Sequence, residues 1–350
     1  METVTVNASV PYPVHISSGL LERAGELIAG VTHSRTCAVI TDTTVEKLYA
    51  APVCRSLQDA GFRVCLHAFP AGEQSKNLQT YGGMLEFLAE NKLTRSDFAV
   101  TLGGGVVGDM GGFAAATYQR GIDFIQIPTT FLAASDSSVG GKTAIDLAAG
   151  KNLAGAFHQP KMVICDTDAF RTLPEDIFAD GVAETVKHGL IADKDFYQFL
   201  MTGDIRAGID EVVRRNVEIK ATVVGEDEKE HGRRKLLNFG HTLGHAIEKC
   251  SGYTISHGRA VSSGMVLASR AAEKLGFSPA GTLDAVLAAC RRFGLPETCP
   301  YTASELYAAA TGDKKRDGGS IDVVVLEETG KAKTVRLDLD GLREFTEAAL

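Results

Sequence analysis

The sequence predicts two domains, an N-terminal α/β domain built on a doubly wound sheet and a mainly α-helical C-terminal domain. Up to about Asp168, short strand-like apolar segments alternate with helical patterns. Strands separated by helices favour a parallel sheet with helices on both faces. Beyond that point, the helical patterns are longer and follow one another directly. A chain of 350 residues also exceeds the usual size of one hydrophobic core. We therefore expect domains at residues 1–168 and 169–350.

The elements of the N-terminal domain can be assigned in order. Strands are expected where apolar and β-branched residues cluster or alternate with polar ones, at residues 3–10, 12–17, 37–42, 63–69, 98–105, 124–130 and 161–166. Helices are expected where apolar residues recur with helical spacing, at residues 19–30, 45–61 and 79–93. This alternation predicts a parallel, doubly wound sheet.

The C-terminal domain contains mostly helical patterns, at residues 176–191, 209–224, 238–250, 260–276 and 283–294. Two later segments, 320–328 and 331–338, have strand character and are separated by the turn residues Thr329 and Gly330, so they predict a hairpin. In such a two-domain chain we expect the functional site in a cleft between the domains.

The composition argues against several classes of protein. A formal net charge of −8 disfavours a nucleic-acid partner, because a phosphate backbone requires a basic surface. The seven cysteines form no C-x-x-C pair, which disfavours disulfides or a thiolate metal site and favours a reducing compartment. We see no secretory signal, and no apolar run approaches the ~20 residues that span a bilayer. We expect a soluble cytoplasmic protein without a membrane partner.

A glycine-rich segment follows one of the expected strands. Gly103, Gly105 and Gly108 form G-x-G-x-x-G, which lets a backbone approach a pyrophosphate closely at a helix N-terminus. Asp109 follows at once, and Asp42 ends another strand, where a carboxylate can hold a cofactor ribose. We expect a Rossmann-like domain, although the fingerprint is not the standard one, because the acidic residue about 20 positions downstream, Asp123, precedes a strand instead of ending one. A role in tight packing also explains the glycines, so the motif alone leaves both interpretations open.

Three histidines and a glutamate suggest a metal site. His241 and His245 are four residues apart and therefore share a helix face. His257 lies in a loop-like segment, and Glu184 lies in a helical pattern. Imidazoles and a carboxylate suit a divalent metal, and three protein ligands leave a position for substrate. Spacing alone favours His241 and His245 as the ligand pair, although ordinary polar histidines would give the same pattern.

Several cations are candidates for binding an anionic substrate. Lys142 and Lys151 lie among glycines and small residues, where backbone and cation together can bind phosphate. Further candidates are Lys187, Lys220, Arg234 and Lys314. An anion site requires that these side chains converge, which spacing does not establish.

These segments together resemble the 3-dehydroquinate synthase family of the sugar-phosphate cyclase superfamily over nearly the whole chain. The segments that carry the resemblance are residues 72–76, 103–122, 127–160, 183–189, 234–248, 257–265 and 313–315. The resemblance implies a dehydroquinate synthase-like fold, shared with metal-dependent polyol dehydrogenases such as glycerol dehydrogenase. It makes residues 1–168 an NAD-binding domain and residues 169–350 a metal- and substrate-binding domain.

The resemblance also implies cofactors. Zn²⁺ or Co²⁺ would be bound by Glu184, His241 and His257, with His245 lining the site instead. NAD would be bound by Asp42, Glu73, Lys76, Gly104, Gly105, Asp109, Thr129, Thr130, Lys151 and Thr172. NAD would be regenerated in each turnover, because the hydride it accepts is returned.

The implied substrate is 3-deoxy-D-arabino-heptulosonate 7-phosphate, converted to 3-dehydroquinate in the shikimate pathway. Asp136 and Lys187 would contact the hydroxyl groups of this substrate, and Asn238 would contact its reacting portion. Its carboxylate would meet Lys220 and Arg234. Its phosphate would meet Lys142, Asn152, His245 and Lys314, together with Arg120 of the partner subunit in a homodimer.

Two other activities remain open on the sequence, and so does a non-catalytic NAD-binding or scaffold protein, which would leave the histidines and the glutamate unexplained. A metal-dependent polyol dehydrogenase would share the nucleotide domain and the metal but would not need so many cations. Another sugar-phosphate cyclase would act on a substrate without a carboxylate, which would leave Lys220 and Arg234 without a partner. Arg259 and Thr44 depart from residues usual in the family, and neither is an implied metal ligand.

Overall fold

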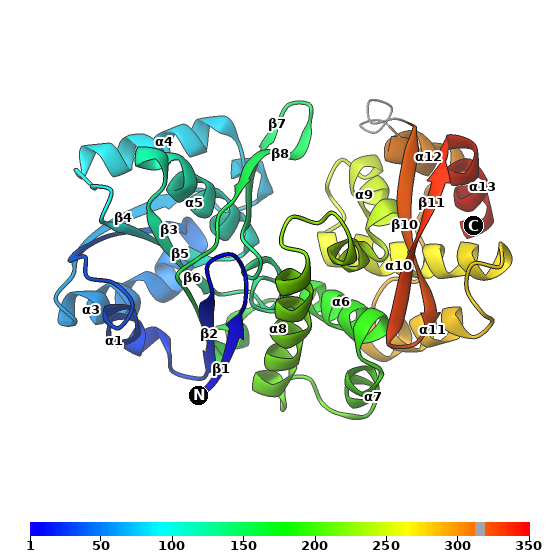
Figure 1. Cartoon of the computed structure of the whole chain (residues 1–350), viewed down its shortest axis with the longest axis horizontal. Coiled ribbons are helices and arrows are strands. Elements are labelled where there is room, and N and C mark those ends of the chain that lie inside the picture. The colour runs from blue at the N-terminus through cyan, green and yellow to red at the C-terminus, as the bar shows by residue number, and fades with distance from the viewer. Residues whose placement is uncertain (312–318) are drawn as a thin grey trace. The chain divides into compact units, whose positions relative to one another are not determined.

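The computed structural model describes residues 1–311 and 319–350 (Figure 1). The chain forms two compact units, Met1–Pro174 with Ile209–Lys229, and Glu175–Gly208 with Glu230–Leu350. The sequence suggested a single boundary after residue 168. The observed division differs from this expectation because helix α8 (Ile209–Glu226) belongs to the first unit. It buries its apolar face there, beside strands β1 and β2. An amphipathic pattern predicts a helix but does not say which core its apolar face covers.

The first unit is built on a sheet with the strand order β1-β2-β9-β6-β5-β3-β4. Strands β1 and β2 pair antiparallel, and the remaining pairs are parallel. The strands are β1 (Glu2–Val6), β2 (Tyr12–Ser17), β3 (Thr36–Asp42), β4 (Arg63–Phe69), β5 (Phe98–Gly103), β6 (Asp123–Pro128) and β9 (Met162–Asp166). The seven expected strands are therefore confirmed, most of them with slightly different ends.

Helices cover both faces of this sheet, as expected for a doubly wound fold (Figure 1). Val39 and Val100 contribute to one buried cluster with α1 (Ala24–Ala29) and α3 (Ala51–Asp59). The adjacent residues Ala38 and Ala99 point to the opposite face, against α4 and α5. The helices of that face are α4 (Leu78–Glu90) and α5 (Gly105–Thr117). Shorter helical segments are η1 (Leu21–Arg23), α2 (Thr43–Val45), η2 (Glu46–Ala50), η3 (Glu73–Ser75), η4 (Tyr118–Arg120), η5 (Ala133–Ser137) and η6 (Thr167–Thr172).

A hairpin not expected from the sequence connects β6 to β9. It consists of β7 (Lys142–Leu147) and β8 (Gly150–Phe157), which pair antiparallel. Its residues are mostly small, so the alternation that marks a strand is weak. Gly155 is required by the close pairing, because a Cβ there would lie 2.1 Å from the carbonyl oxygen of Thr143.

The second unit is mainly helical and contains the expected hairpin. Helix α10 (His257–Lys274) is buried along much of its length and packs against α6, α9, α11, α13 and β10. The other elements are α6 (Glu175–Ala192), α7 (Lys194–Thr202), η7 (Arg233–Asn238), α9 (His241–Cys250), α11 (Thr282–Phe293), α12 (Ala303–Thr311), β10 (Ser320–Glu328), β11 (Lys331–Asp338) and α13 (Leu339–Ala349). Strands β10 and β11 pair antiparallel. Within the described residues, no helix is both long and apolar enough to cross a membrane.

Candidate functional site

The glycine-rich segment forms the turn from β5 into α5. Gly104 precedes the helix and Gly105 is its first residue. Side chains here would crowd the segment after β6, since a Cβ on Gly104 would lie 3.1 Å from Cγ2 of Thr130, and one on Gly105 would lie 3.2 Å from Oγ of Ser137. Backbone N–H groups at the start of a helix attract phosphate oxygens when the backbone can be approached closely. The expected strand–turn–helix context of the motif is confirmed.

The later glycines of this segment serve packing. A Cβ on Gly108 would lie 2.7 Å from Oε1 of Gln126 on β6, and one on Gly111 would lie 2.4 Å from Cγ2 of Thr101 on β5. Helix α5 therefore lies on the sheet at a distance that larger side chains would not allow. The packing interpretation is confirmed for these later glycines, and pyrophosphate binding by the first part of the motif stays a prediction.

Asp42 and Thr129 lie at the same sheet edge as the glycine turn. Asp42 ends β3, which is parallel and adjacent to β5. Its Oδ1 accepts hydrogen bonds from the N–H groups of Thr44 at 2.8 Å and Val45 at 3.0 Å. Thr129 follows β6 and donates its N–H to the carbonyl oxygen of Gly103 at 3.0 Å. Carboxyl ends of parallel strands are the usual place for a nucleotide in this type of sheet.

Lys76 joins two candidate residues in an ionic cluster. Its Nζ lies 2.6 Å from Oδ2 of Asp109 and 2.6 Å from Oδ1 of Asn152. The Lys76 side chain is only 5% exposed. Burial by itself would lower the pKa of Lys76, but the Asp109 carboxylate outweighs this effect and raises it. Lys76 is therefore a charged, fixed group that ties α5 to the β7–β8 hairpin.

Two further pairs in the first unit involve candidate cofactor residues. Glu73 and Lys151 form an ion pair at 3.1 Å, with both side chains partly exposed. The hydroxyl of Tyr49 lies 2.5 Å from Oγ1 of Thr172. Thr172 also donates to the Ala169 carbonyl oxygen at 3.1 Å. The candidate cofactor residues of this unit are thus held by neighbouring side chains and backbone.

The candidate substrate residues of the first unit differ in their surroundings. Lys220, on α8, forms a buried ion pair at 2.5 Å with Oδ1 of Asp136 and also contacts the Asp136 carbonyl oxygen. Lys142 begins β7 and is exposed. Arg120 is exposed in the turn after α5, with a positive φ of 68°. Convergence of these cations with residues of the second unit stays a prediction.

Glu184, His241 and His257 converge within the second unit. Their ligand atoms all lie within 4.8 Å of one another. Nε2 of His257 lies 3.2 Å from Oε1 of Glu184, and Nε2 of His241 lies 3.6 Å from the same oxygen. Glu184 is fully buried and His241 is nearly so. Two imidazoles and one carboxylate at this spacing fit a Zn²⁺ or Co²⁺ ion with an open coordination position.

Glycines bring the three helices of this group together. A Cβ on Gly264 of α10 would lie 2.1 Å from the carbonyl oxygen of Gly240, which immediately precedes α9. A Cβ on Gly258 would lie 2.3 Å from Cα of Asp180 on α6. Asp180 also accepts hydrogen bonds from the Ser256 hydroxyl at 2.7 Å and the Arg259 N–H at 3.2 Å. The start of α10, and hence His257, is thereby fixed against the helix that carries Glu184.

Each histidine of the group presents Nε2 toward Glu184 because Nδ1 is held elsewhere. Nδ1 of His241 lies 3.1 Å from the carbonyl oxygen of Phe239. Nδ1 of His257 lies 3.3 Å from Oε2 of Glu248. Burial lowers the pKa of His241 to about 3, so this imidazole is neutral. Burial would also lower the pKa of His257, but hydrogen bonds to Glu184 and Glu248 outweigh it and raise the pKa to about 10.

The sequence matches two family models, 3-dehydroquinate synthase N-terminal at residues 66–180 and 3-dehydroquinate synthase C-terminal at residues 181–316. The chain belongs to the 3-dehydroquinate synthase family. It is 45% identical over 340 residues to the 3-dehydroquinate synthase of Enterococcus faecalis (strain ATCC 47077 / OG1RF), which covers 95% of both chains. The resemblance found in the sequence motifs is therefore confirmed.

Solved structures of related cyclases share the fold of this 3-dehydroquinate synthase family member. A 2-deoxy-scyllo-inosose synthase complexed with carbaglucose-6-phosphate, NAD⁺ and Co²⁺ is 25% identical and superimposes with a TM-score of 0.89 over 99% of both chains. A 2-epi-5-epi-valiolone synthase from Streptomyces hygroscopicus subsp. jinggangensis 5008, with NAD⁺ and Zn²⁺ bound, is 26% identical. Its TM-score is 0.86 over 97% of this chain and 96% of that one.

The remaining 3-dehydroquinate synthase motifs lie close to the metal candidates in the sequence of the second unit. Lys187 lies one helical turn after Glu184, contacts its carboxylate and is buried. Arg234 is buried in η7. Asn238, at the end of η7, donates its Nδ2–H to Oε1 of Glu230 at 2.6 Å. Lys314 lies outside the described residues.

Two buried carboxylates of this 3-dehydroquinate synthase family member were not singled out from its sequence. Asp180 holds the start of α10, and Glu248 lies behind His257. Both could have been found from helical spacing. Asp180 is four residues before Glu184, and Glu248 is seven residues after His241, so each shares a helix face with a metal candidate. His245, which spacing alone favoured as a ligand, is exposed and belongs instead to a second group with Glu248 and His257.

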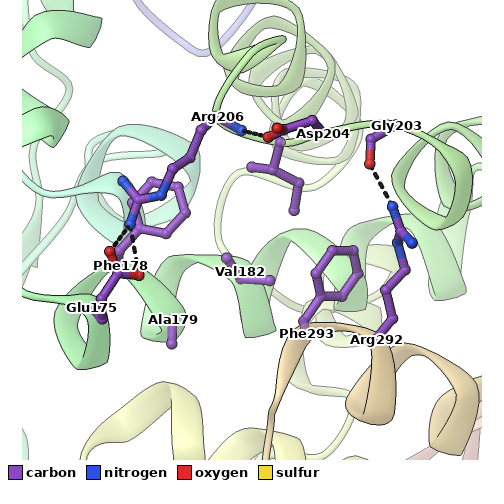
Figure 2. Close-up of a pocket in the computed structure, with 10 residues that line it drawn as sticks. Glu175, Phe178, Ala179, Val182, Gly203, Asp204, Arg206, Arg292 and Phe293 are labelled. Atoms are coloured by element: carbon purple, nitrogen blue, oxygen red, sulfur yellow. Dashed lines mark hydrogen bonds and ion pairs between the residues drawn. The ribbon is translucent and has the colours of Figure 1, made fainter.

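A pocket of about 420 Å³ lies elsewhere in the second unit (Figure 2). Arg206 and Arg292 both line it. Nη2 of Arg206 donates to both carboxylate oxygens of Glu175 at 2.8 Å, and the guanidinium stacks over the ring of Phe178. Arg292 donates to the carbonyl oxygen of Gly203 at 2.5 Å. The described residues that line this pocket include none of the candidate site residues. We therefore assign the arginines to holding α6, α7 and α11 together.

Proposed function

We propose that this chain converts 3-deoxy-D-arabino-heptulosonate 7-phosphate to 3-dehydroquinate and phosphate, in the shikimate pathway toward aromatic amino acids. Similarity to 3-dehydroquinate synthases over nearly the whole chain supports a phosphate-eliminating cyclase. The observation that carries the proposal is the convergence of Glu184, His241 and His257 beside the buried Lys187. This arrangement suits a substrate with neighbouring hydroxyl groups. A metal held by these three residues could bind one hydroxyl, while the ammonium group of Lys187 donates a hydrogen bond to the next.

The proposal includes a divalent metal and NAD. Glu184, His241 and His257 would hold the metal, and the related cyclases bound to NAD⁺ and Co²⁺ or Zn²⁺ support both cofactors. When bound, the metal supplies Lewis acidity that favours ionisation of a hydroxyl, and NAD supplies a reversible hydride acceptor. NAD would be held by Asp42, Glu73, Lys76, Gly104, Gly105, Asp109, Thr129, Thr130, Lys151 and Thr172.

The chain's own side chains would bind and orient the substrate. Lys187 would donate a hydrogen bond to a substrate hydroxyl beside Glu184, and Asp136 would contact another hydroxyl. Asn238 would orient the reacting portion of the substrate. Each charge-assisted contact of this kind contributes about 1.5–3 kcal/mol. The carboxylate would meet Lys220 and Arg234. The phosphate would meet Lys142, Asn152, His245, Lys314 and Arg120 of the partner subunit.

The homodimer and a cytoplasmic location are part of the same proposal. Arg120 is exposed and lies in a tight turn, so its side chain is accessible to a partner subunit, which supports a shared site. All seven cysteines lie in the described part of the chain and are free thiols, which supports a reducing compartment.

The direct test is phosphate release from the heptulosonate phosphate in the presence of Zn²⁺ and a catalytic amount of NAD. Absorbance of NADH would be followed in the same sample, and the product would be identified by NMR. Stoichiometric phosphate without net NADH is expected, because the hydride is returned in each turnover. NADH that accumulates in step with substrate loss would instead identify a polyol dehydrogenase.

A second cyclase activity is the alternative, favoured by the TM-score of 0.89 with the inosose synthase. Its substrate would be a sugar phosphate without a carboxylate. The two activities are separated by comparing glucose 6-phosphate with the heptulosonate phosphate, and by the variant Arg234→Ala. Loss of a carboxylate contact should reduce kcat/KM for the heptulosonate about 10- to 100-fold. Turnover of glucose 6-phosphate that Arg234→Ala leaves unchanged would favour the alternative.

A further inference from the structure

Glu248 completes a helix face that carries two histidines. Residues 241, 245 and 248 of α9 are spaced i, i+4 and i+7, so His241, His245 and Glu248 lie along one side of the helix. Glu248 is only 3% exposed. A buried carboxylate is costly unless a partner compensates its charge, so its position calls for a specific role.

Glu248 contacts the imidazole of His257 at Nδ1, the ring nitrogen that does not face Glu184. Oε2 of Glu248 lies 3.3 Å from Nδ1, while Oε1 of Glu184 lies 3.2 Å from Nε2 of the same ring. Both ring nitrogens thus face a carboxylate. Turning the ring by 180° would replace both nitrogens with carbons at these contacts, so the orientation of the imidazole is fixed. When a metal displaces the proton on Nε2, the proton that stays on Nδ1 points to Glu248, and the lone pair of Nε2 points toward the space shared with Glu184 and His241.

The two candidate ligand histidines have different acceptors behind them. Nδ1 of His241 faces a backbone carbonyl oxygen, that of Phe239, at 3.1 Å. Nδ1 of His257 faces the Glu248 carboxylate. A carboxylate behind a ligating imidazole raises its basicity and strengthens its bond to a metal more than a neutral acceptor does. His257 is therefore the ligand whose strength depends on a second side chain.

From this geometry we infer that Glu248 is a positioning residue for the metal centre, acting through His257. The inference rests on the metal site of the proposed function and adds a residue to it. Glu248 accepts the Nδ1–H of His257, holds the ring in the tautomer that binds metal through Nε2, and increases the donor strength of that nitrogen. A competing arrangement is a second cation held by His245, Glu248 and His257, whose ligand atoms also lie within 4.8 Å of one another.

The test is Co²⁺ binding to metal-free protein, measured by competition with a chromophoric chelator at fixed pH and by the visible ligand-field spectrum. Wild type, Glu248→Ala and Glu248→Gln would be compared. The affinity of Glu248→Ala should fall about 10- to 100-fold. Glu248→Gln should fall less, because its amide oxygen still accepts the Nδ1–H but carries no charge. Both variants should bind one equivalent of Co²⁺ with an altered spectrum.

A matched control is Glu273→Gln. Glu273 lies on α10 and accepts hydrogen bonds from Thr282 and Leu283. This variant should lose stability without changing Co²⁺ affinity. If Glu248→Ala does not fold, Glu248→Gln still decides the question, because it preserves size and the hydrogen bond.

Three results would overturn the inference, and they differ from one another. Unchanged affinity and spectrum in both Glu248 variants would make Glu248 purely structural. Two equivalents of Co²⁺ in wild type and one in the variants would replace positioning with a second cation site. No Co²⁺ binding by wild type would remove the metal centre itself, and with it the metal part of the proposed function.

Discussion

At the scale of single residues, Lys76 compensates the Asp109 carboxylate within the first unit. Replacing one partner of a buried pair leaves the other charge uncompensated, which costs about 3–5 kcal/mol. Because the Asp109 side chain is 21% exposed, we expect Lys76→Met to lower the free energy of unfolding by about 3 kcal/mol, at the low end of that range. Urea denaturation monitored by circular dichroism would measure the change.

The matched control for Lys76 is Lys161→Met. Lys161 and Asp123 are 3.6 Å apart, and their side chains are 41% and 54% exposed. Exposed pairs contribute below about 1 kcal/mol, so this variant should be nearly as stable as wild type. If both variants lost the same free energy of unfolding, burial of the Lys76–Asp109 pair would not increase its contribution to stability.

The metal candidates show what residue spacing can and cannot predict. Helical spacing placed His241 and His245 on one face, which is correct. It could not identify the partners that other helices bring to that face. The approach of Glu184 and His257 depends on contacts of Gly258 and Gly264 with backbone from α6 and from the residue before α9. The resemblance supplied those partners, whereas Glu248 was missed although it shares the histidine face.

At the scale of elements, close contacts between helices should be sensitive to one added methyl group. A Cβ on Gly264 would lie 2.1 Å from the carbonyl oxygen of Gly240, which cannot move without shifting α9. Overpacking of this kind costs about 1–3 kcal/mol. We expect Gly264→Ala to lose stability and Co²⁺ affinity together, since α9 carries His241 and α10 carries His257.

The comparison for Gly264 is Gly82→Ala. Gly82 lies within α4, and a Cβ there would have nothing within 4 Å. Alanine favours a helix over glycine by about 1 kcal/mol, so Gly82→Ala should be as stable as wild type or more so. Thermal unfolding and chelator competition would measure both variants. A Gly264→Ala protein with wild-type Co²⁺ affinity would contradict the role of this helix contact in building the site.

Helix α8 provides a prediction for pH dependence. Hydrogen bonds from Arg214, and also from Arg215, lower the pKa of Glu211 to about 2. A carboxyl group with a lowered folded-state pKa stabilises the fold above its unfolded pKa and loses that contribution as pH falls toward the folded value. Glu211 is 36% exposed, so its contribution should stay below about 1 kcal/mol.

The corresponding measurement compares wild type with Glu211→Gln by urea denaturation at several pH values. Wild type should be more stable at pH 6, and the difference should shrink as the pH is lowered through 4 toward 2. The variant's glutamine cannot ionise, so it supplies the baseline. A difference that stays constant over this range would rule out the charge of Glu211 as its cause.

Elements with strong patterns were predictable, and those made of small residues were not. The parallel strands of the first unit and the hairpin β10–β11 have β-branched runs bounded by turns, and the structure confirms them. The β7–β8 hairpin has few large apolar residues, and its pairing depends on Gly155 fitting against Thr143. Such a fit is a property of two chain segments together, so a local pattern does not reveal it.

At the scale of the whole molecule, the fold class followed from the order of elements, but the division into units did not. Alternating strands and helices predicted the doubly wound sheet, and successive helical patterns predicted the helical unit. Helix α8 was expected with the helical unit and packs instead beside β1 and β2. Its sequence shows an apolar face that either core could have covered. Long-range packing, rather than helix propensity, decides such a choice.

The proposed dimer can be tested through Arg120, which lies in a turn with positive φ values at Gln119, Arg120 and Gly121. Two variants that are inactive alone, Arg120→Ala and His257→Ala, would be co-expressed with different tags and the mixed dimer purified with both. If Arg120 serves the partner's site, a mixed dimer has one complete site, formed by the metal group of one chain and the arginine of the other. Before purification about half of the dimers are mixed, and each mixed dimer has one complete site of two. The unselected mixture should therefore recover about a quarter of wild-type activity.

The same experiment separates action within one chain from action across the dimer. An Arg120 that served its own chain's site would leave every site in the mixture defective, so no activity would return. Elution of the wild type as a monomer in size-exclusion chromatography with light scattering would contradict the shared site before any mixing. Recovery in the doubly tagged fraction, and not in either singly tagged one, is the expected result, because only there does an intact arginine meet an intact Glu184–His241–His257 group.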